Sequence, residues 1–256
     1  MQDRKDRVFL VGVHWSKDSR EHYNESVNEL NHLADTAEVE VIKTFIQTLK
    51  KPNTATYIGK GKLQEIKTLV QKLKVNTLIF NNNLSPSQSR NISDLTGCNV
   101  VDRTELILDI FARHARTRQS KLQVELAQLE YAYTKLKRLW KHLSRIQGGI
   151  GFRGPGETQI EVDRRGIRKK TAILKKKLKS IEKTSLTKRK KRKDIISIAL
   201  VGYTNAGKST LFNKLTHEDR YTADQLFATL DAKTRSLSLE KTEKLVMTDT
   251  IGFIRK

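Results

Sequence analysis

The sequence contains little cysteine and little proline. Cys98 is the only cysteine in 256 residues, which excludes an internal disulfide and a metal site built from cysteines. Pro52, Pro86 and Pro155 are the only prolines, so most of the chain is free to form long helices.

Long apolar runs are also missing. The longest apolar stretches, such as VFLVGV at 8–13, have the length of buried strands and fall far short of a bilayer span. The first residues, MQDRKDR, are polar and lack the apolar core of a signal peptide. We therefore expect a cytoplasmic protein with no membrane partner.

Acidic residues are scarce relative to basic ones. The chain has 28 Asp and Glu against 50 Lys and Arg, and its net charge is +22. An excess of this size points to a polyanionic partner, and nucleic acid fits better than a membrane surface. Residues 111–193 hold 26 Lys and Arg against 6 Asp and Glu, a net charge of +20. The charge therefore divides the chain into three predicted regions: 1–110, 111–193 and 194–256.

The first region alternates two patterns. Stretches rich in β-branched residues at 7–13, 39–48, 75–81 and 98–102 alternate with helical patterns at 24–37, 61–73 and 85–97. Strands that alternate with helices predict βαβ units and a parallel sheet. The fold class expected for 1–110 is an α/β domain.

Two segments of this region are candidate ligand-binding sites. Asn81, Asn82, Asn83 and Ser85-Pro86 follow a predicted strand, where open α/β sheets place their crevices. The string YIGKGK at 57–62 offers glycine amides and lysines to a phosphate. Its spacing matches no phosphate loop, so a turn that leads into the next helix is the favoured interpretation.

The second region predicts an antiparallel helical hairpin. Apolar and aromatic residues recur at heptad spacing before and after a glycine-rich tip, GGIGFRGPGE at 148–157. Two such helices joined by a short tip pack against each other. The first seam is Leu122, Leu126, Leu129, Tyr133, Leu136, Trp140 and Leu143, and the second is Ile167, Thr171, Leu174, Leu178 and Ile181.

Basic residues crowd the second helix of this predicted hairpin. A charge run on a helix is usually a solvated face, but here nearly all the charges have one sign. Binding to backbone phosphates explains that bias better. The string KRKKRK at 188–193 continues the charge and is expected to form a linker, for which a nucleic-acid patch is favoured over a nuclear address.

The third region carries a phosphate-binding motif. DIISIALV at 194–201 has the composition of a strand buried on both faces, and GYTNAGKST at 202–210 follows it directly. This satisfies G-x-x-x-x-G-K-[ST] between a strand and a helix, the context of a true P-loop. Gly202 and Gly207 let backbone amides approach phosphate oxygens, Lys208 neutralises the β- and γ-phosphates, and Ser209 offers a hydroxyl to Mg²⁺.

A second motif lies downstream. EKLVMTDTIGF at 243–253 places Asp249 at the end of a strand and completes D-x-x-G at Gly252. Asp249 would reach Mg²⁺ through water, and the Gly252 amide would sense the γ-phosphate. The polar stretch 221–236 between the motifs is long enough for a mobile switch loop, in which Thr222, Thr229 and Thr234 compete for Mg²⁺.

These motifs resemble one family. GYTNAGKST, FATLD and DTIGF look like the nucleotide motifs of HflX-type ribosome-associated GTPases, and GGIGFRGPGETQIEVDRRGIRKK looks like the signature that precedes them. The similarity extends through YIGKGKLQEI and TELILDIFARHARTRQSKLQVELAQL and covers essentially the whole chain. The P-loop domain implied is a doubly wound α/β domain, incomplete at its C-terminal end.

The resemblance implies a function and a set of site residues. Such GTPases hydrolyse GTP, bind the large ribosomal subunit, and split or rescue stalled ribosomes, with the hairpin tip near ribosomal RNA; we expect a monomer. Thr229 and Ser209 would hold Mg²⁺. The expected RNA contacts are Arg153, Arg164, Arg165, Arg168, Lys169 and Lys170. The expected nucleotide contacts are Gly202, Tyr203, Thr204, Asn205, Ala206, Gly207, Lys208, Ser209, Thr210, Phe227, Ala228, Thr229, Leu230, Asp231, Asp249, Thr250, Ile251 and Gly252.

Two departures leave alternatives open. Phe253 stands where many small GTPases carry the glutamine that orients water, which implies slow intrinsic hydrolysis. No N-K-x-D guanine-reading motif follows the D-x-x-G within the 256 residues, so the residues themselves do not distinguish guanine from adenine. An ATP-using P-loop protein and a non-enzymatic RNA-binding protein therefore remain alternatives to a GTPase.

Overall fold

The structure is a computed structural model that describes residues 6–15, 20–146, 155–190, 195–216, 226–227, 230, 232–239 and 243–253. The chain forms two compact units. Unit 1 comprises Met1–Asp109 and Gln128–Arg168, and unit 2 comprises Ile110–Ala127 and Lys169–Lys256. The boundaries at 110 and 193 expected from the charge distribution stay a prediction.

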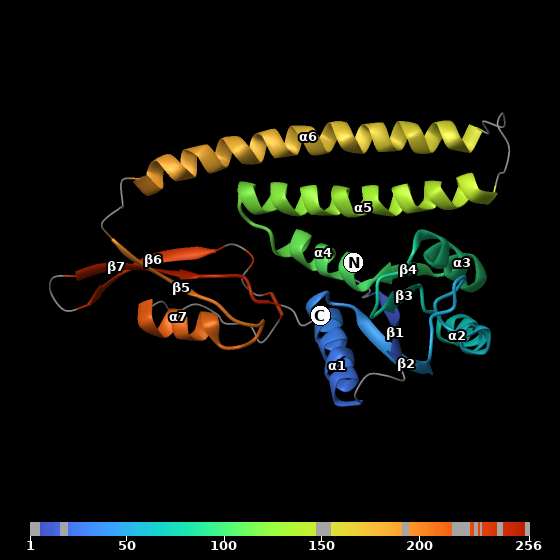
Figure 1. Ribbon diagram of the computed structural model, residues 1–256. Helices are drawn as coiled ribbons and strands as arrows, with labels where there is room; N and C mark the ends of the chain where they lie inside the picture. Colours follow the sequence, from blue (N-terminus) through green and yellow to red (C-terminus); the bar gives the residue numbers. More distant parts are fainter. Residues whose placement is uncertain are drawn as a thin grey trace, which may run out of the picture. The chain divides into compact units, whose positions relative to one another are not determined.

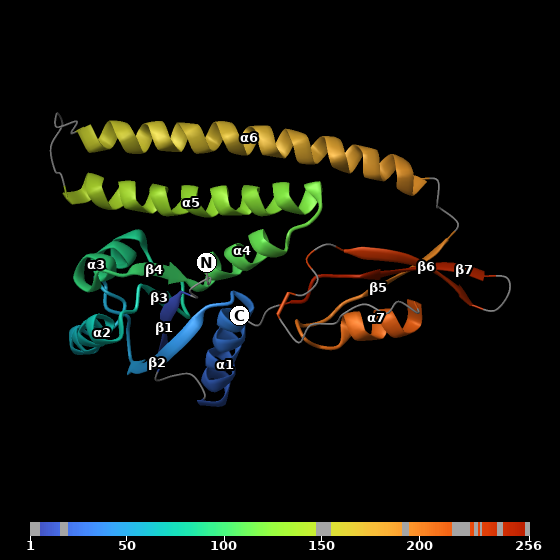
Figure 2. The ribbon, with the colours of Figure 1, turned by 180° about the vertical axis from the view of Figure 1, so that it is seen from behind.

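Unit 1 is built on a four-stranded parallel sheet with the order β2-β1-β3-β4, as Figures 1 and 2 show. This confirms the α/β class predicted for the first region. The strands are β1 (Arg7–Trp15), β2 (Glu40–Leu49), β3 (Thr77–Phe80) and β4 (Asn99–Asp102), and the connecting helices are α1 (Arg20–Thr36), α2 (Lys60–Leu73) and α3 (Pro86–Thr96).

The core of unit 1 lies around β1. This strand is buried from Val8 to Val13 because it has strands on both sides and helices on both faces. Alternate residues Phe9, Val11 and Val13 join one core cluster with side chains from α2 and β3. A near-continuous apolar run is typical of a strand enclosed in this way.

The two segments of this region that were candidate ligand sites have structural roles. Asn81 is buried, accepts a hydrogen bond from Arg103 at 2.6 Å and donates one to Ser26 at 2.9 Å. Ser85 caps α3 by accepting from the Gln88 amide, and the Gln88 side chain accepts from the Ser85 amide. YIGKGK forms a turn with its Tyr57–Ile58 end buried, and α2 begins at Lys60, as the turn interpretation predicted.

A buried carboxylate fixes the next helices to the sheet of unit 1. Asp102 ends β4, is fully buried, and exchanges capping hydrogen bonds with Glu105 at the start of α4 (Arg103–His114). Its other oxygen accepts from the Tyr131 hydroxyl at 2.7 Å and pairs with Lys135 at 2.9 Å. Tyr131 and Lys135 belong to α5 (Arg118–Ile146). Burial, reinforced by the bond to Asp102, raises the pKa of the Tyr131 phenol.

The hairpin predicted for the second region is present. Helix α6 (Pro155–Lys190) runs beside α5 in both views, and their seam residues are half-buried or buried wherever their side chains are described. Leu174, at 5% exposed, is the most enclosed of the second seam.

The predicted ends of the hairpin need correction. The tip was expected to stay non-helical through Glu157, but α6 begins at Pro155, since proline is well tolerated in the first turn of a helix. The linker expected at 188–193 is helical through Lys190, because lysine and arginine are good helix formers. Residues 147–154 and 191–194 lie outside the described residues.

Unit 2 holds a three-stranded sheet with the order β5-β7-β6. Its elements are β5 (Ile196–Leu200), α7 (Lys208–Thr216), β6 (Lys233–Leu239) and β7 (Glu243–Asp249). Strand β5 pairs parallel to β7, and β6 pairs antiparallel to it. Phe212 of α7, only 1% exposed, packs on Leu245 and Met247.

Two expectations for this region are wrong. The strand at 194–201 was predicted to be buried on both faces, yet Ile196 is 61% exposed and Ile198 is 39% exposed. The reason is that β5 is an edge strand, while α7 packs over β6 and β7. The switch loop expected to reach residue 236 ends earlier, because β6 begins at Lys233.

Among the described residues, no helix has the combination of length and apolarity needed to cross a bilayer.

Candidate functional site

The P-loop joins β5 to α7 in unit 2. Asn205 has φ 59° and Gly207 has φ 78°, left-handed conformations that asparagine and glycine adopt most readily. Helix α7 starts at Lys208, so the amides of its first turn point toward the loop and form an anion-binding end. The Lys208 ammonium donates a hydrogen bond to the Tyr203 carbonyl of the same loop. The motif from Gly202 to Thr210 is thus folded as a phosphate cradle.

The D-x-x-G segment is bonded directly to this loop. The Thr204 amide donates to the Phe253 carbonyl, and the Phe253 amide donates to the Gly202 carbonyl, both at 3.0 Å. A Cβ atom on Gly252 would lie 2.6 Å from the backbone nitrogen of Thr204, so only glycine permits this approach. The two motifs, about 50 residues apart in the sequence, therefore form one site.

The two described Mg²⁺ candidates meet at this point. The Ser209 hydroxyl donates to Asp249 Oδ2 at 2.7 Å, and Asp249 is 1% exposed. Thr250 fastens the strand end beside them by donating to the Leu200 carbonyl at 2.6 Å. A hydroxyl and a buried carboxylate are hard oxygen donors, which is the ligand chemistry that Mg²⁺ requires next to phosphate. The residues present fit this ion.

The switch candidates are distributed differently. Thr222, Ala228, Thr229 and Asp231 lie outside the described residues. Thr234 lies on β6, where its hydroxyl shares a 3.1 Å hydrogen bond with the Thr248 hydroxyl. Leu226, Phe227 and Leu230 are buried, with 7%, 3% and 8% of their surfaces exposed.

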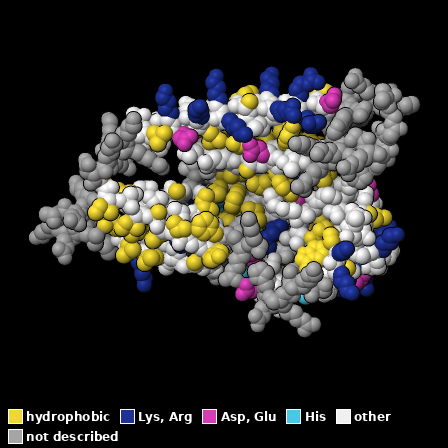
Figure 3. All heavy atoms as spheres, in the orientation of Figure 1, with side chains coloured by type: hydrophobic (Ala, Val, Ile, Leu, Met, Phe, Trp, Pro, Cys, Tyr) yellow, Lys and Arg dark blue, Asp and Glu magenta, His cyan; other side chains and the backbone are white. Residues whose placement is uncertain are grey.

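The candidate RNA-binding residues lie on α6. Arg165, Lys169 and Lys170 are exposed, and Figure 3 shows Lys and Arg spaced along the outward surface of this helix. Arg164 and Arg168 differ, because their guanidinium carbons lie 5.7 and 5.3 Å from the Tyr133 ring centre of α5. Hydrogen bonding from Arg164 and Arg168 holds the pKa of the Tyr133 phenol below its usual value. Arg153 lies outside the described residues.

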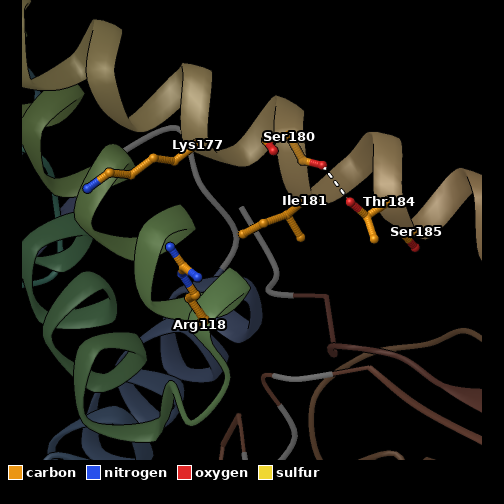
Figure 4. A pocket seen from close by; sticks show the side chains of 6 residues that line it. All are labelled: Arg118, Lys177, Ser180, Ile181, Thr184 and Ser185. Carbon is orange, nitrogen blue, oxygen red and sulfur yellow. Dashed lines mark hydrogen bonds between the residues drawn. The ribbon is translucent and has the colours of Figure 1, made fainter.

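A basic groove lies between the start of α5 and α6 in unit 2 (Figure 4). Arg118 rises from α5 toward α6, and Lys177 extends from α6 over α5. The groove has a volume of about 450 Å³, and its remaining lining residues are Ser180, Ile181, Thr184 and Ser185. Two cations and three hydroxyls, with no carboxylate among these lining residues, match the side chains that bind nucleic-acid phosphates.

Comparison with known families covers nearly the whole chain. Residues 24–112 match the family described as "GTP-binding GTPase N-terminal", residues 114–192 match "GTP-binding GTPase Middle Region", and residues 197–256 match "50S ribosome-binding GTPase". The GTPase HflX of Caldanaerobacter subterraneus subsp. tengcongensis is 49% identical over 254 residues, which are 98% of this chain and 58% of that protein. The GTPase HflX of Escherichia coli K12 is 44% identical over 255 residues, which are 99% of this chain and 59% of that protein.

The chain belongs to the HflX family of GTPases. It spans about 60% of the length of the curated relatives it matches. A solved structure also matches this HflX-family chain: a GTP-binding protein from the hyperthermophilic archaeon Sulfolobus solfataricus in complex with GDP. It is 30% identical, has a TM-score of 0.50, and aligns with 98% of this chain and 62% of that one.

Some residues of this HflX-family chain that touch the site were not singled out from the sequence. Phe111 packs edge-on against Phe227, with ring centres 4.7 Å apart. Ala115 and Val124 pack with Leu230. The sequence gives no local signal for these contacts, because Phe111 and Ala115 are ordinary apolar positions and Val124 lies outside the heptad seam.

Proposed function

We propose that this chain binds and hydrolyses GTP with Mg²⁺ in the cytoplasm, and that it associates with the large ribosomal subunit to split or rescue stalled ribosomes. One observation carries the nucleotide part: the P-loop is hydrogen-bonded to the D-x-x-G segment, and Ser209 meets Asp249 beside it. The guanine nucleotide and the ribosome come from the names of the relatives and of the family matched by residues 197–256.

Each side chain of the site has a role in this proposal. The amides of the P-loop and Lys208 would hold the β- and γ-phosphates, and Ser209 and Thr229 would bind Mg²⁺, with Asp249 acting through water. The ion supplies positive charge to the phosphate oxygens. The Gly252 amide would bond the γ-phosphate and register its loss. Phe253 is apolar and 57% exposed, so it cannot orient a water, and intrinsic hydrolysis is expected to be slow.

Titration of the 256-residue chain with GTP and with ATP, each with Mg²⁺, tests the nucleotide part. We expect both to bind, with affinities within about tenfold of each other, because binding rests on phosphates and Mg²⁺ and no N-K-x-D motif is present. Phosphate release then tests hydrolysis. Failure of both nucleotides to bind would contradict the proposal, and a strong guanine preference would mean that other residues read the base.

Exposed cations of the helical hairpin support the RNA part. Arg165, Lys169 and Lys170 are exposed on α6, and the groove at Arg118 and Lys177 adds cations and hydroxyls. A non-enzymatic RNA-binding protein is the second candidate, because these cations lie outside the P-loop motifs. Phosphate release by the chain, if it is lost in a P-loop variant, excludes that candidate.

RNA affinity is expected to fall steeply with salt, since each phosphate contact releases counterions. Replacing Arg165, Lys169 and Lys170 by alanine is expected to reduce the slope of log affinity against log salt by about 2 to 3. Fluorescence anisotropy with a labelled ribosomal RNA fragment measures this slope.

The matched control removes three lysines of unit 1, Lys67, Lys72 and Lys74, and so changes the net charge equally. It is expected to leave the slope nearly unchanged. An equal effect of both triple substitutions would contradict an RNA site on α6, and a flat salt response would remove the electrostatic argument.

A further inference from the structure

Two described residues of the predicted switch loop, Phe227 and Leu230, contact apolar residues of α4, α5 and the turn between them. The Phe227 ring meets the Phe111 ring at 4.7 Å with an interplanar angle of 90°, and Leu230 packs with Ala115 and Val124. All of these residues belong to unit 2. Phe111, Ala115 and Val124 lie outside the segment 197–256 that matches the ribosome-binding GTPase family. These contacts are therefore supplied from outside the nucleotide motifs.

The backbone at Phe227 is held in an uncommon conformation. Its φ of 58° lies in the left-handed region, which bulky side chains rarely adopt and which costs about 1–3 kcal/mol. Such a conformation persists only where its surroundings enforce it. Phe227 is 3% exposed, and Phe111 is its one ring contact among the described residues. The ring pair is thus one contact that helps to hold Phe227 in this conformation.

The backbone conformation at Phe227 matters for the residue two positions later. Thr229 follows Phe227 by two residues and is the Mg²⁺ ligand of the proposed function, so the direction of the chain at Phe227 limits where Thr229 can lie. A switch threonine contacts Mg²⁺ only while the γ-phosphate is present. Loosening the Phe111–Phe227 contact should therefore weaken triphosphate binding and leave diphosphate binding nearly unchanged.

We propose that Phe111 is a positioning residue that acts through Phe227 and sets the preference of the site for nucleoside triphosphate over diphosphate. The inference rests on the proposed function, because it assigns a role toward the same nucleotide site. A merely structural role for Phe111 would lower the affinities for both nucleotides, or stability alone, without changing their ratio.

The test compares the affinities of the chain for GDP and for a non-hydrolysable GTP analogue, both with Mg²⁺. In Phe111→Ala the analogue is expected to bind about 3- to 10-fold more weakly, the range that loss of an edge-to-face aromatic pair gives, with GDP affinity within about twofold. Phe111→Leu, which keeps apolar volume, is expected to restore part of the ratio. Phe227→Ala should mimic Phe111→Ala, and the double variant should add little to either.

Leu106→Ala is the matched control, because it removes a buried side chain from the same helix and leaves the ring pair in place. An unchanged ratio in Phe111→Ala, or an equal shift in Leu106→Ala, would overturn this inference alone. Failure of the unsubstituted chain to bind either nucleotide would overturn the proposed function and this inference together.

Discussion

Lys208→Ala is expected to lower the affinity for GTP by about 100-fold or more and to leave RNA affinity within about twofold. The Lys208 ammonium lies inside the P-loop, where it donates to the Tyr203 carbonyl, and in the proposed complex it would bond two phosphate groups. Two charge-assisted hydrogen bonds contribute about 3 kcal/mol or more, which corresponds to that factor. Nucleotide titration and RNA anisotropy on the same preparation measure both affinities.

Lys214→Ala provides the control for this prediction. Lys214 is exposed in the last turn of α7, so its removal changes the net charge equally and spares the loop. Its GTP affinity is expected to match that of the unsubstituted chain. If a correctly folded Lys208→Ala protein lost nucleotide and RNA binding equally, the assignment of the two activities to separate segments would be wrong.

Asp102→Ala is expected to lower the free energy of unfolding of unit 1 by about 3 kcal/mol. The substitution removes a fully buried carboxylate that caps α4 and binds Tyr131 and Lys135 of α5. Loss of one partner from such a network leaves the others with unmatched polar groups, and the helix cap is lost as well. Urea unfolding followed by circular dichroism measures the change.

Asp109→Ala tests whether burial is the cause. Asp109 is an exposed carboxylate on the same helix, and its replacement is expected to change stability by less than about 0.5 kcal/mol. Asp102→Asn, which keeps an acceptor for the cap, should fall between the two. Equal stabilities of Asp102→Ala and Asp109→Ala would show that the network does not fasten α5.

The sequence predicted those elements whose signals are local. Strand β1 is an unbroken apolar run, the segment 85–97 that forms α3 has a helical pattern, and the P-loop stands between a strand and a helix. The hairpin followed from apolar residues repeated at heptad spacing, and the seam residues whose side chains are described are half-buried or buried. These features depend on neighbours within a few turns of the chain.

The exposure of strand β5 was predicted wrongly, because distant partners decide it. The segment 194–201 has the composition of a strand buried on both faces. The exposure of its residues Ile196 and Ile198 depends on the strand order β5-β7-β6 and on where α7 packs. The helix start at Pro155 has a local cause instead, since proline is favoured in a first helical turn even within a glycine-rich string.

The sequence by itself determined the α/β class, the hairpin and the residue types that bind phosphate, because periodicity and motif spacing act over short distances. Only the tertiary structure decided that Gly252 lies against Thr204, that Ser209 meets Asp249, and that Phe111 holds Phe227. Each of these contacts joins residues at least 40 positions apart. A single sequence carries no local signal for such pairs, since their approach is fixed by how the sheet and helices pack.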